Sequence, residues 1–254
     1  MEIIDSHLHI GKWKIPMYFG LQNSVKQTDS VLRSCNISGA IAMPSDELKN
    51  AQLLKELQDN AQLKYWFFPW INPKDRNIMK FLETNLDSIA GLKFHGSLCK
   101  CKITNPAYKK FLVFAERNSL PVLAHAGRWQ KMASYKYVIE LAWKWPGIDF
   151  IMAHQGGDSP ELKVNAALEI RKAKLQNIWL DVSATREFWT IPMGIKEIGA
   201  SRFLFGSDYP VVHPSAGIAM IDSLRLDKKD TEKILGKNIF NIINRRKYIG
   251  GMKK

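Results

Sequence analysis

The 254-residue chain is long enough for one large domain or two small ones with a substantial buried core. Three unevenly spaced cysteines argue against a disulfide framework, and no apolar run approaches the ~18–20 residues that span a bilayer. The N-terminal residues do not have the pattern of a signal peptide, so we expect a cytoplasmic protein without a membrane partner.

The formal net charge of +13 raises the question of an anionic partner. The lysines are scattered over amphipathic segments, where a solvated polar face accounts for them. We therefore do not expect nucleic acid as a partner, and expect the charge to favour an anionic small molecule. The sequence leaves a homo-oligomer open.

Short apolar segments alternate with longer amphipathic ones along the whole chain, and eight of the apolar segments are typical of strands. These expected strands span residues 2–10, 38–44, 65–71, 89–96, 120–127, 149–157, 177–184 and 201–210. The third expected strand contains Pro69, which cannot donate a ladder hydrogen bond, so we expect it to be the least regular.

Helical patterns lie between the expected strands. The segments 105–118 and 159–174 each begin with a capping residue followed by proline, Asn105 before Pro106 and Ser159 before Pro160. Eight strand–helix units without a glycine-rich phosphate turn after the first strand favour a closed barrel over an open sheet. We predict an α/β fold of the (β/α)₈ TIM-barrel class, regular or distorted, as one domain over residues 1–254.

The first expected strand, EIIDSHLHI, carries Asp5, His7 and His9 at two-residue intervals. Alternate side chains of a strand share a face, so these three would face one side and Ile4 and Leu8 the other. Two imidazoles on one face could bind a metal ion or be hydrogen-bonded structural residues. The tripeptide alone does not decide between them.

Chemistry in a TIM barrel gathers at the carboxyl ends of the strands. Six residues occupy such ends here: His7, His9, His95, His125, His154 and Asp208. Core packing would not favour histidine at the carboxyl ends of the strands over the amino ends. Five histidines at the carboxyl ends therefore indicate a common role. Imidazole and carboxylate suit a divalent cation that keeps an open position and lowers the pKa of a bound water to about 7.

The ordered set of motifs around these residues carries a family resemblance. The segments are IIDSHLHI, GLKFHG, LPVLAHAG, FIMAHQGG, WLDVSA and FGSDYP, followed by a C-terminal helix pattern, EKILGKNIFNII. Together they resemble the amidohydrolase superfamily, and more narrowly its amidohydrolase-2 branch of metal-dependent TIM-barrel hydrolases and decarboxylases.

The resemblance implies four metal ligands, which are His7, His9, His125 and Asp208. Asp208 would also be the general base, taking a proton from the metal-bound water and passing it to the leaving group. His154 would contact the substrate and polarise the reacting group in a one-metal site, or bind the second ion in a two-metal site. Asp5 would orient the histidines of the first strand.

Lys93 bears on the number of metal ions. In some superfamily members a carboxylated lysine of the fourth strand bridges two metals, whereas the GLKFHG type of string goes with one. We expect one divalent cation, zinc by default, with Mn²⁺ or Fe²⁺ suiting the same donors, and a second ion only if Lys93 is carboxylated. Lys93 and His95 are also candidate substrate contacts, although His95 could equally be a rim or structural residue.

The loops after the strands should select the substrate. The first, at 11–24, is long and aromatic enough to be a lid. Arg128 and Arg186 follow later strands and could bind a carboxylate or phosphate, or could be solvated or ion-paired. Cys99 and Cys101 could join a metal or a redox pair, which a Cys-x-Cys spacing alone does not establish.

We expect a metal-dependent hydrolase that uses activated water on an amide, lactone or ester bond of a small molecule. A nonoxidative decarboxylase of a carboxylic acid would use the same ligands and is the alternative. A TatD-like metal-dependent nuclease ranks below both, because that branch carries glutamate where this chain has Lys93. A non-catalytic binding protein also ranks below, because the five core residues of the motifs are intact.

Overall fold

A computed structural model describes residues 2–46, 49–127 and 129–250 of the chain. All of its strands pair in parallel except β2, which forms an antiparallel hairpin with β1. The strands are β1 (Ile4–Lys12), β2 (Gln22–Asn23), β3 (Gly39–Pro44), β4 (Lys64–Phe67), β5 (Trp70–Ile71), β6 (Leu92–Phe94), β7 (Val122–Ala124), β8 (Phe150–Met152), β9 (Ile178–Asp181) and β10 (Phe203–Leu204).

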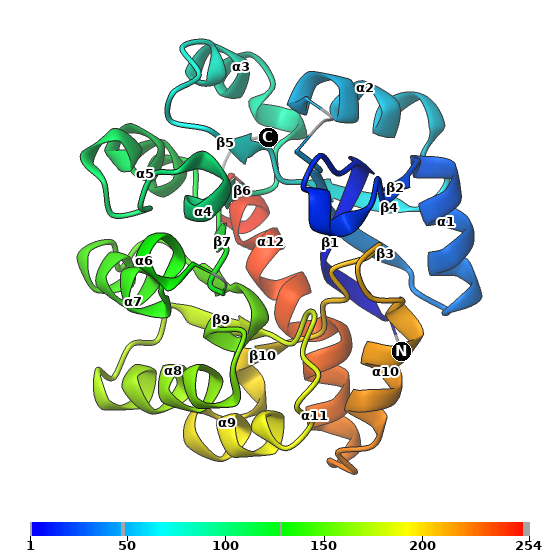
Figure 1. Cartoon of the computed structure of the whole chain (residues 1–254), viewed down its shortest axis with the longest axis vertical. Helices are drawn as coiled ribbons and strands as arrows, with labels where there is room; N and C mark the ends of the chain where they lie inside the picture. Colours follow the sequence, from blue (N-terminus) through cyan, green and yellow to red (C-terminus); the bar gives the residue numbers. More distant parts are fainter. Residues whose placement is uncertain (1, 47–48, 128, 251–254) are drawn as a thin grey trace.

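Helices surround the strands in a ring when the molecule is viewed as in Figure 1. Within the described ranges, no helix has both the length and the apolar character needed to cross a membrane. The α-helices are α1 (Val25–Ser34), α2 (Asn50–Asn60), α3 (Ile78–Thr84), α4 (Gly96–Cys99), α5 (Lys109–Arg117), α6 (Gln130–Ala133), α7 (Tyr135–Lys144), α8 (Pro160–Lys172), α9 (Thr190–Ile198), α10 (Pro214–Asp222), α11 (Lys228–Glu232) and α12 (Asn238–Gly250). Shorter turns of 3₁₀ or π geometry are η1 (Pro16–Tyr18), η2 (Leu86–Ser88), η3 (Pro106–Tyr108), η4 (Ala153–Gly156), η5 (Ala200–Arg202) and η6 (Lys233–Lys237).

The two expected helix starts are confirmed. The Ser159 hydroxyl accepts from the Leu162 N–H at 3.4 Å, and Pro160 is the first residue of α8. Asn105 accepts from the Ala107 N–H at 2.9 Å, but the segment it caps begins as the 3₁₀ turn η3 before α5 continues. Side-chain acceptors at these positions satisfy N–H groups that have no partner within the helix.

The strand ladders form two sheets, in the orders β2-β1-β3-β4 and β10-β9-β8-β7-β6-β5. Backbone hydrogen bonds link the two sheets where the ladders stop, three of them between β1 and the segment after β10. On one side the Asp208 N–H donates to the His7 carbonyl at 2.7 Å, and on the other the Ala90 N–H donates to the Phe67 carbonyl at 3.0 Å. With β4 and β5 counted as one interrupted strand, eight parallel strands are arranged as a distorted barrel, which confirms the predicted fold class.

The interruption between β4 and β5 falls at Phe68 and Pro69. Proline has no N–H to donate, so the ladder cannot continue through it, as the sequence predicted. A second irregularity lies in β1, whose register against β3 shifts between Asp5 and Leu8. The shift places Ile4 and Leu8 in different core clusters, so the expectation that they share one face is wrong.

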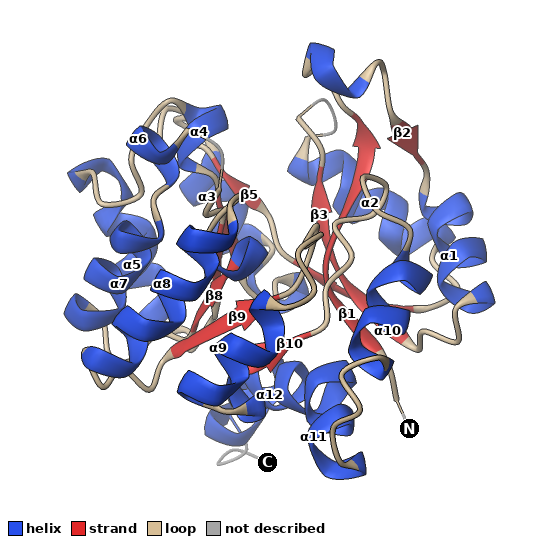
Figure 2. Ribbon diagram, turned by 60° about the horizontal axis from the view of Figure 1, so that its bottom comes forward, coloured by secondary structure: helices blue, strands red, loops and turns tan. Residues whose placement is uncertain are grey.

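The apolar core has two parts. One cluster fills the barrel interior with residues such as Leu123 and Ile151, and the other lies between the strands and the outer helices. Helix α12 contributes Ile239 and Ile242 to the interior cluster. Figure 2 shows α12 at the end of the molecule opposite the β1–β2 hairpin, so this helix covers the amino-terminal end of the barrel.

Replacing Ile239, which is 0% exposed, with alanine should lower the free energy of unfolding by about 2–5 kcal/mol, because it leaves a cavity under the barrel. Its neighbour Phe240 on the same helix is 40% exposed, and Phe240→Ala is the matched control with a smaller expected loss. Urea unfolding of both variants measures the difference. Equal losses would contradict the role assigned to α12.

Candidate active site

A cavity of about 330 Å³ opens at the carboxyl ends of the strands. All six strand-end residues singled out in the sequence line it: His7, His9, His95, His125, His154 and Asp208. Arg186 lies on its wall, whereas Arg128 falls outside the described residues. Lys93 is fully buried beneath the cavity, with its Nζ 3.2 Å from the His7 Nε2.

Three of these side chains form a compact group suited to a metal ion. The Asp208 Oδ1 is 3.5 Å from the His7 Nε2 and 3.8 Å from the His9 Nε2. All three ligand atoms lie within 4.8 Å of one another. A tetrahedral cation with bonds of about 2.0–2.1 Å separates its ligands by roughly 3.3 Å, so the spacing is right, and three protein ligands leave a position open.

The hydrogen bonds of the two imidazoles fix which nitrogen can bind the ion. The His7 Nδ1 is 2.9 Å from the Asp181 Oδ2, and the His9 Nδ1 is 3.0 Å from the Pro44 carbonyl oxygen. A carboxylate and a carbonyl only accept, so both Nδ1 atoms carry the proton and both Nε2 atoms are left as lone pairs. Because these lone pairs lie beside the Asp208 carboxylate, the residues present fit a divalent cation.

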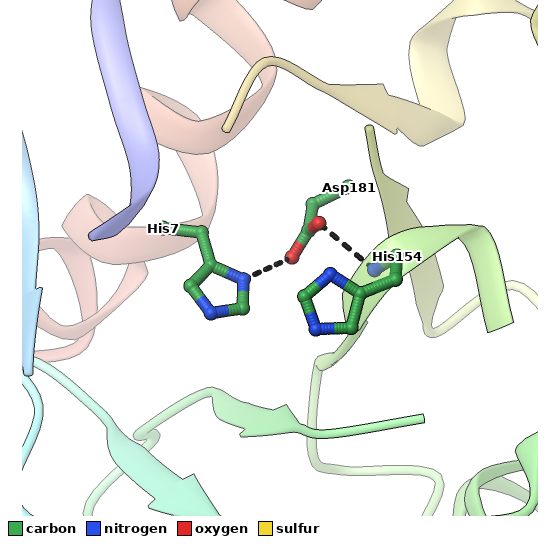
Figure 3. Close-up of side chains that lie close together, drawn as sticks. All are labelled: His7, His154 and Asp181. Carbon is green, nitrogen blue, oxygen red and sulfur yellow. Dashed lines mark hydrogen bonds and ion pairs between the residues drawn. The ribbon is translucent and has the colours of Figure 1, made fainter. Parts of the chain in front are cut away.

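Asp181, at the end of β9, was not singled out from the sequence, although it belongs to the WLDVSA motif. Its Oδ1 accepts from the backbone N–H of His154 at 3.0 Å while its Oδ2 accepts from His7, as Figure 3 shows. Burial opposes ionisation of this carboxyl, but the charge and hydrogen bond of His7 hold the pKa of Asp181 well below its ordinary value. Its position at a strand end is the signal that could have found it.

His7, His154 and Asp181 also lie close enough together to be considered as a second metal group. Their hydrogen bonds argue against that use. The atom that His7 turns toward Asp181 is its protonated Nδ1, and Asp181 already accepts three hydrogen bonds through Oδ1, two from Ser183 and one from the His154 backbone. This group orients the histidines rather than holding an ion.

The cavity floor comprises His7, His9, His125, His154 and Asp208. Two of these residues, His154 and His125, are hydrogen-bonded to each other. The His154 Nδ1 is 3.1 Å from the Ser183 carbonyl oxygen, so it carries the proton, and its Nε2 accepts from the His125 Nδ1 at 3.2 Å. His125 therefore lies outside the compact group of His7, His9 and Asp208, although it lines the same cavity. His154 and Asp208 both have positive φ, 56° and 63°, a backbone conformation that is rare outside glycine and often found at functional sites.

Burial sets the protonation of the floor. It lowers the pKa of His7 to about 3, helped by the charge of Lys93, and so leaves the neutral imidazole that binds metal. Burial also raises the pKa of Asp208 to about 8 and lowers that of Lys93 to about 8. Burial thus shifts His7, Asp208 and Lys93 toward their uncharged forms.

Asp5, Cys99 and Cys101 do not line the cavity described above. Asp5 acts on His7 through the backbone: its Oδ1 accepts from the backbone N–H groups of His7 at 3.0 Å and Ser207 at 2.9 Å, so it holds the backbone of β1. Cys99 is buried and donates to a backbone carbonyl, and Cys101 is a second free thiol. Within the described ranges, neither cysteine belongs to a candidate metal group.

The walls of the cavity differ in character. The β1–β2 hairpin contributes Trp13 and Tyr18 to an apolar wall, but Phe19 at its tip is 95% exposed and does not line the cavity. Lys163 of α8 and Arg186 add polar surface to the cavity lining. Lys163 is buried and ion-paired with Glu187, whereas Arg186 has no ion pair within the described residues.

A family model described as Amidohydrolase matches residues 4–240, so the chain belongs to this family of metal-dependent enzymes, as its motifs predicted. No curated protein sequence matches the chain significantly.

Solved structures share the fold at low identity, and each covers 96% of this chain. A probable 2-pyrone-4,6-dicarboxylic acid hydrolase from Acinetobacter baumannii, with citric acid bound, is 16% identical with a TM-score of 0.72 over 100% of that chain. 5-Carboxyvanillate decarboxylase from Sphingomonas paucimobilis is 10% identical with a TM-score of 0.73 over 99% of its length. A zinc-bound amidohydrolase from Burkholderia multivorans is 13% identical with a TM-score of 0.75 over 99% of its length. At these identities, the likeness establishes the fold.

Asp181→Asn should weaken binding of a divalent cation about 10- to 100-fold, because the amide cannot hold His7 in its orientation as the carboxylate does. Zinc affinity can be measured by competition with a chromophoric chelator. Asp158→Asn is the matched control, since Asp158 lines the same cavity and, among the described residues, no hydrogen bond joins it to an imidazole. Equal affinities for the wild type and Asp181→Asn would show that this carboxylate does not support the metal ligands.

The affinity for zinc should rise about tenfold per pH unit between pH 6 and 8, because a cation must displace a proton from Asp208. The raised pKa of Asp208, about 8, keeps that proton bound where an exposed aspartate has lost it. Loss of the Lys93 proton near pH 8 acts in the same direction, whereas the pKa of His7 lies below this range. A pH-independent affinity in the competition assay would contradict this assignment.

Proposed function

We propose that the protein is a hydrolase that uses one divalent cation and water to cleave an amide, lactone or ester bond of a small molecule. The observation that carries this proposal is the group of His7, His9 and Asp208, with both Nε2 lone pairs beside one carboxylate at the base of the cavity. When bound there, the cation would lower the pKa of water to about 7 and polarise the scissile bond.

We propose zinc as the cation, because the nitrogen and oxygen donors and the open position suit it, although Mn²⁺ and Fe²⁺ bind the same donor types. His125 would be a fourth protein ligand, since its Nδ1–H is donated to His154 and its Nε2 keeps the lone pair, and water would then be the fifth ligand. A second ion would require Lys93 to be carboxylated. As an ammonium, Lys93 lies against the His7 Nε2 and repels a further cation.

Asp208 is the proposed general base. Its carboxylate borders the metal group, where it can take a proton from the attacking water and give it to the leaving group. Burial raises the pKa of Asp208, which allows the carboxyl to hold that proton between the two steps. His154 lines the cavity on the β8 side and would contact the substrate there, while its Nε2 accepts from the His125 Nδ1–H.

The walls favour a substrate with an apolar body and an anionic group. Trp13 and Tyr18 offer aromatic surface on one side, and Arg186 offers a guanidinium on the other that can bind a carboxylate through two hydrogen bonds. The cysteines described above are all free thiols, which is consistent with the cytoplasmic location that we propose.

Nonoxidative decarboxylation of a carboxylic acid is the second candidate function. It is favoured by Arg186 on the cavity wall, and by the decarboxylase among the solved structures with the same fold. The two reactions need the same metal ligands and differ in which bond of the bound substrate breaks.

A panel of lactones, amides, esters and aromatic acids, assayed with zinc-loaded protein and CO₂ detection, separates the two reactions. Asp208→Asn should lower kcat about 10²- to 10⁴-fold on any substrate found, because it removes the base. Zinc content measured on the same samples distinguishes loss of the base from loss of the metal. Full activity of the metal-loaded Asp208→Asn variant would overturn the proposed role.

A further inference from the structure

His95 differs from the other histidines of the cavity in how its ring is held. It caps the amino-terminal end of α4, where the Leu98 backbone N–H donates to its Nδ1 at 3.3 Å. A backbone N–H can only donate, so this Nδ1 carries a lone pair. A neutral His95 therefore carries its proton on Nε2.

The other four cavity histidines have the opposite arrangement. Three of them give their Nδ1–H to an oxygen acceptor: His7 to Asp181, His9 to Pro44 and His154 to Ser183. The fourth, His125, gives its Nδ1–H to the His154 Nε2. Four rings thus present Nε2 as an acceptor or a ligand, and His95 presents an N–H.

The His95 ring is also fixed in its plane. It stacks against Trp70 with centroids 5.0 Å apart and planes 5° from parallel, and against His125 at 3.9 Å and 11°. Its Nδ1 edge is tied to α4, so the opposite edge is the one available to the cavity that His95 lines. No hydrogen bond to its Nε2 is found among the residues that the structure describes. Burial and the charge of Lys93 keep the pKa of His95 well below its ordinary value, consistent with a neutral ring.

We propose that His95 is a further catalytic residue. Its Nε2–H donates a hydrogen bond to the carbonyl oxygen of the amide, lactone or ester group that water attacks. This inference rests on the proposed hydrolytic function. In hydrolysis that oxygen gains negative charge, and a donor fixed in advance stabilises it without reorganisation. A neutral imidazole suits the role, because it donates a hydrogen bond to the oxygen without transferring its proton when the reaction begins. His154 cannot take this role in the arrangement observed, since its Nε2 is an acceptor.

Two substitutions separate the two edges of the ring. His95→Asn places an amide near Nδ1, so it can keep the cap on α4 but cannot reach the cavity as a donor. His95→Gln places an N–H near Nε2 and keeps the donor. His213→Asn is the matched control, because His213 caps α10 through the Ser215 N–H in the same way but does not line the cavity.

On a substrate identified with the wild type, His95→Asn should lower kcat about 10²- to 10³-fold with unchanged zinc content and melting temperature. His95→Gln should recover at least a tenth of the wild-type kcat, and His213→Asn should match the wild type. A kcat for His95→Asn within threefold of the wild type would overturn the proposal. So would loss of activity in His95→Gln as deep as in His95→Asn, because the donor would then not be what matters.

The proton position can be read without a substrate. In full-length protein labelled with ¹⁵N-histidine, the His95 signals, assigned by their absence in His95→Asn, should be those of the Nε2–H tautomer. The Nδ1–H tautomer would overturn the proposal whatever the kinetics show. If the wild type turned over nothing in the panel, the proposed function would fail, and the tautomer measurement would still decide whether His95 is the donor.

Discussion

The hydrogen bond between the His7 Nδ1 and the Asp181 Oδ2 is the interaction on which the rest of the site depends. It connects β1 to β9, two strands that share no ladder, and it decides which nitrogen of His7 carries the lone pair. The same carboxylate holds the backbone of His154 through its other oxygen. One buried anion therefore fixes the ring of one histidine and the main chain of another, so both sides of the cavity floor take their geometry from it.

A second constraint is the apolar surroundings of the floor. Burial keeps the imidazoles neutral, raises the pKa of Asp208 and lowers that of Lys93, so each group is pushed toward its uncharged form. A bound cation would lower the pKa of Asp208 again, because its positive charge favours the ionised carboxylate. The fold thus positions the ligands, and the bound ion would favour the ionised form of Asp208.

The sequence predicted most of the architecture, since strand and helix periodicity is local. The eight strands, the caps at Asn105 and Ser159 and the break at Pro69 all follow from residues near one another in the chain. The register shift in β1 did not follow, because it depends on how β1 meets β3. The hairpin with β2 was likewise missed: its strand is only two residues long, too short for a periodic signal.

Most members of the candidate site were predictable from the sequence, but Asp181 and the roles of the individual residues were not. A barrel gathers strand ends at one rim, so residues such as His7, His154 and Asp208 could be grouped from the sequence. Which nitrogen of each ring is free depends on acceptors from other strands, and Asp181 is 174 positions from His7. That information exists only once the barrel has formed.

The β1–β2 hairpin connects the base of the cavity to its aromatic wall. The strand that carries His9 continues without interruption into the wall that carries Trp13, and the Trp13 ring lies edge-on to the His9 ring with centroids 4.8 Å apart. A molecule that packs on the indole would therefore contact a ring that itself contacts His9, one of the proposed metal ligands. Any effect of a molecule bound at this wall on the affinity of the cavity for a metal ion must be matched by an equal effect of the ion on the affinity for that molecule.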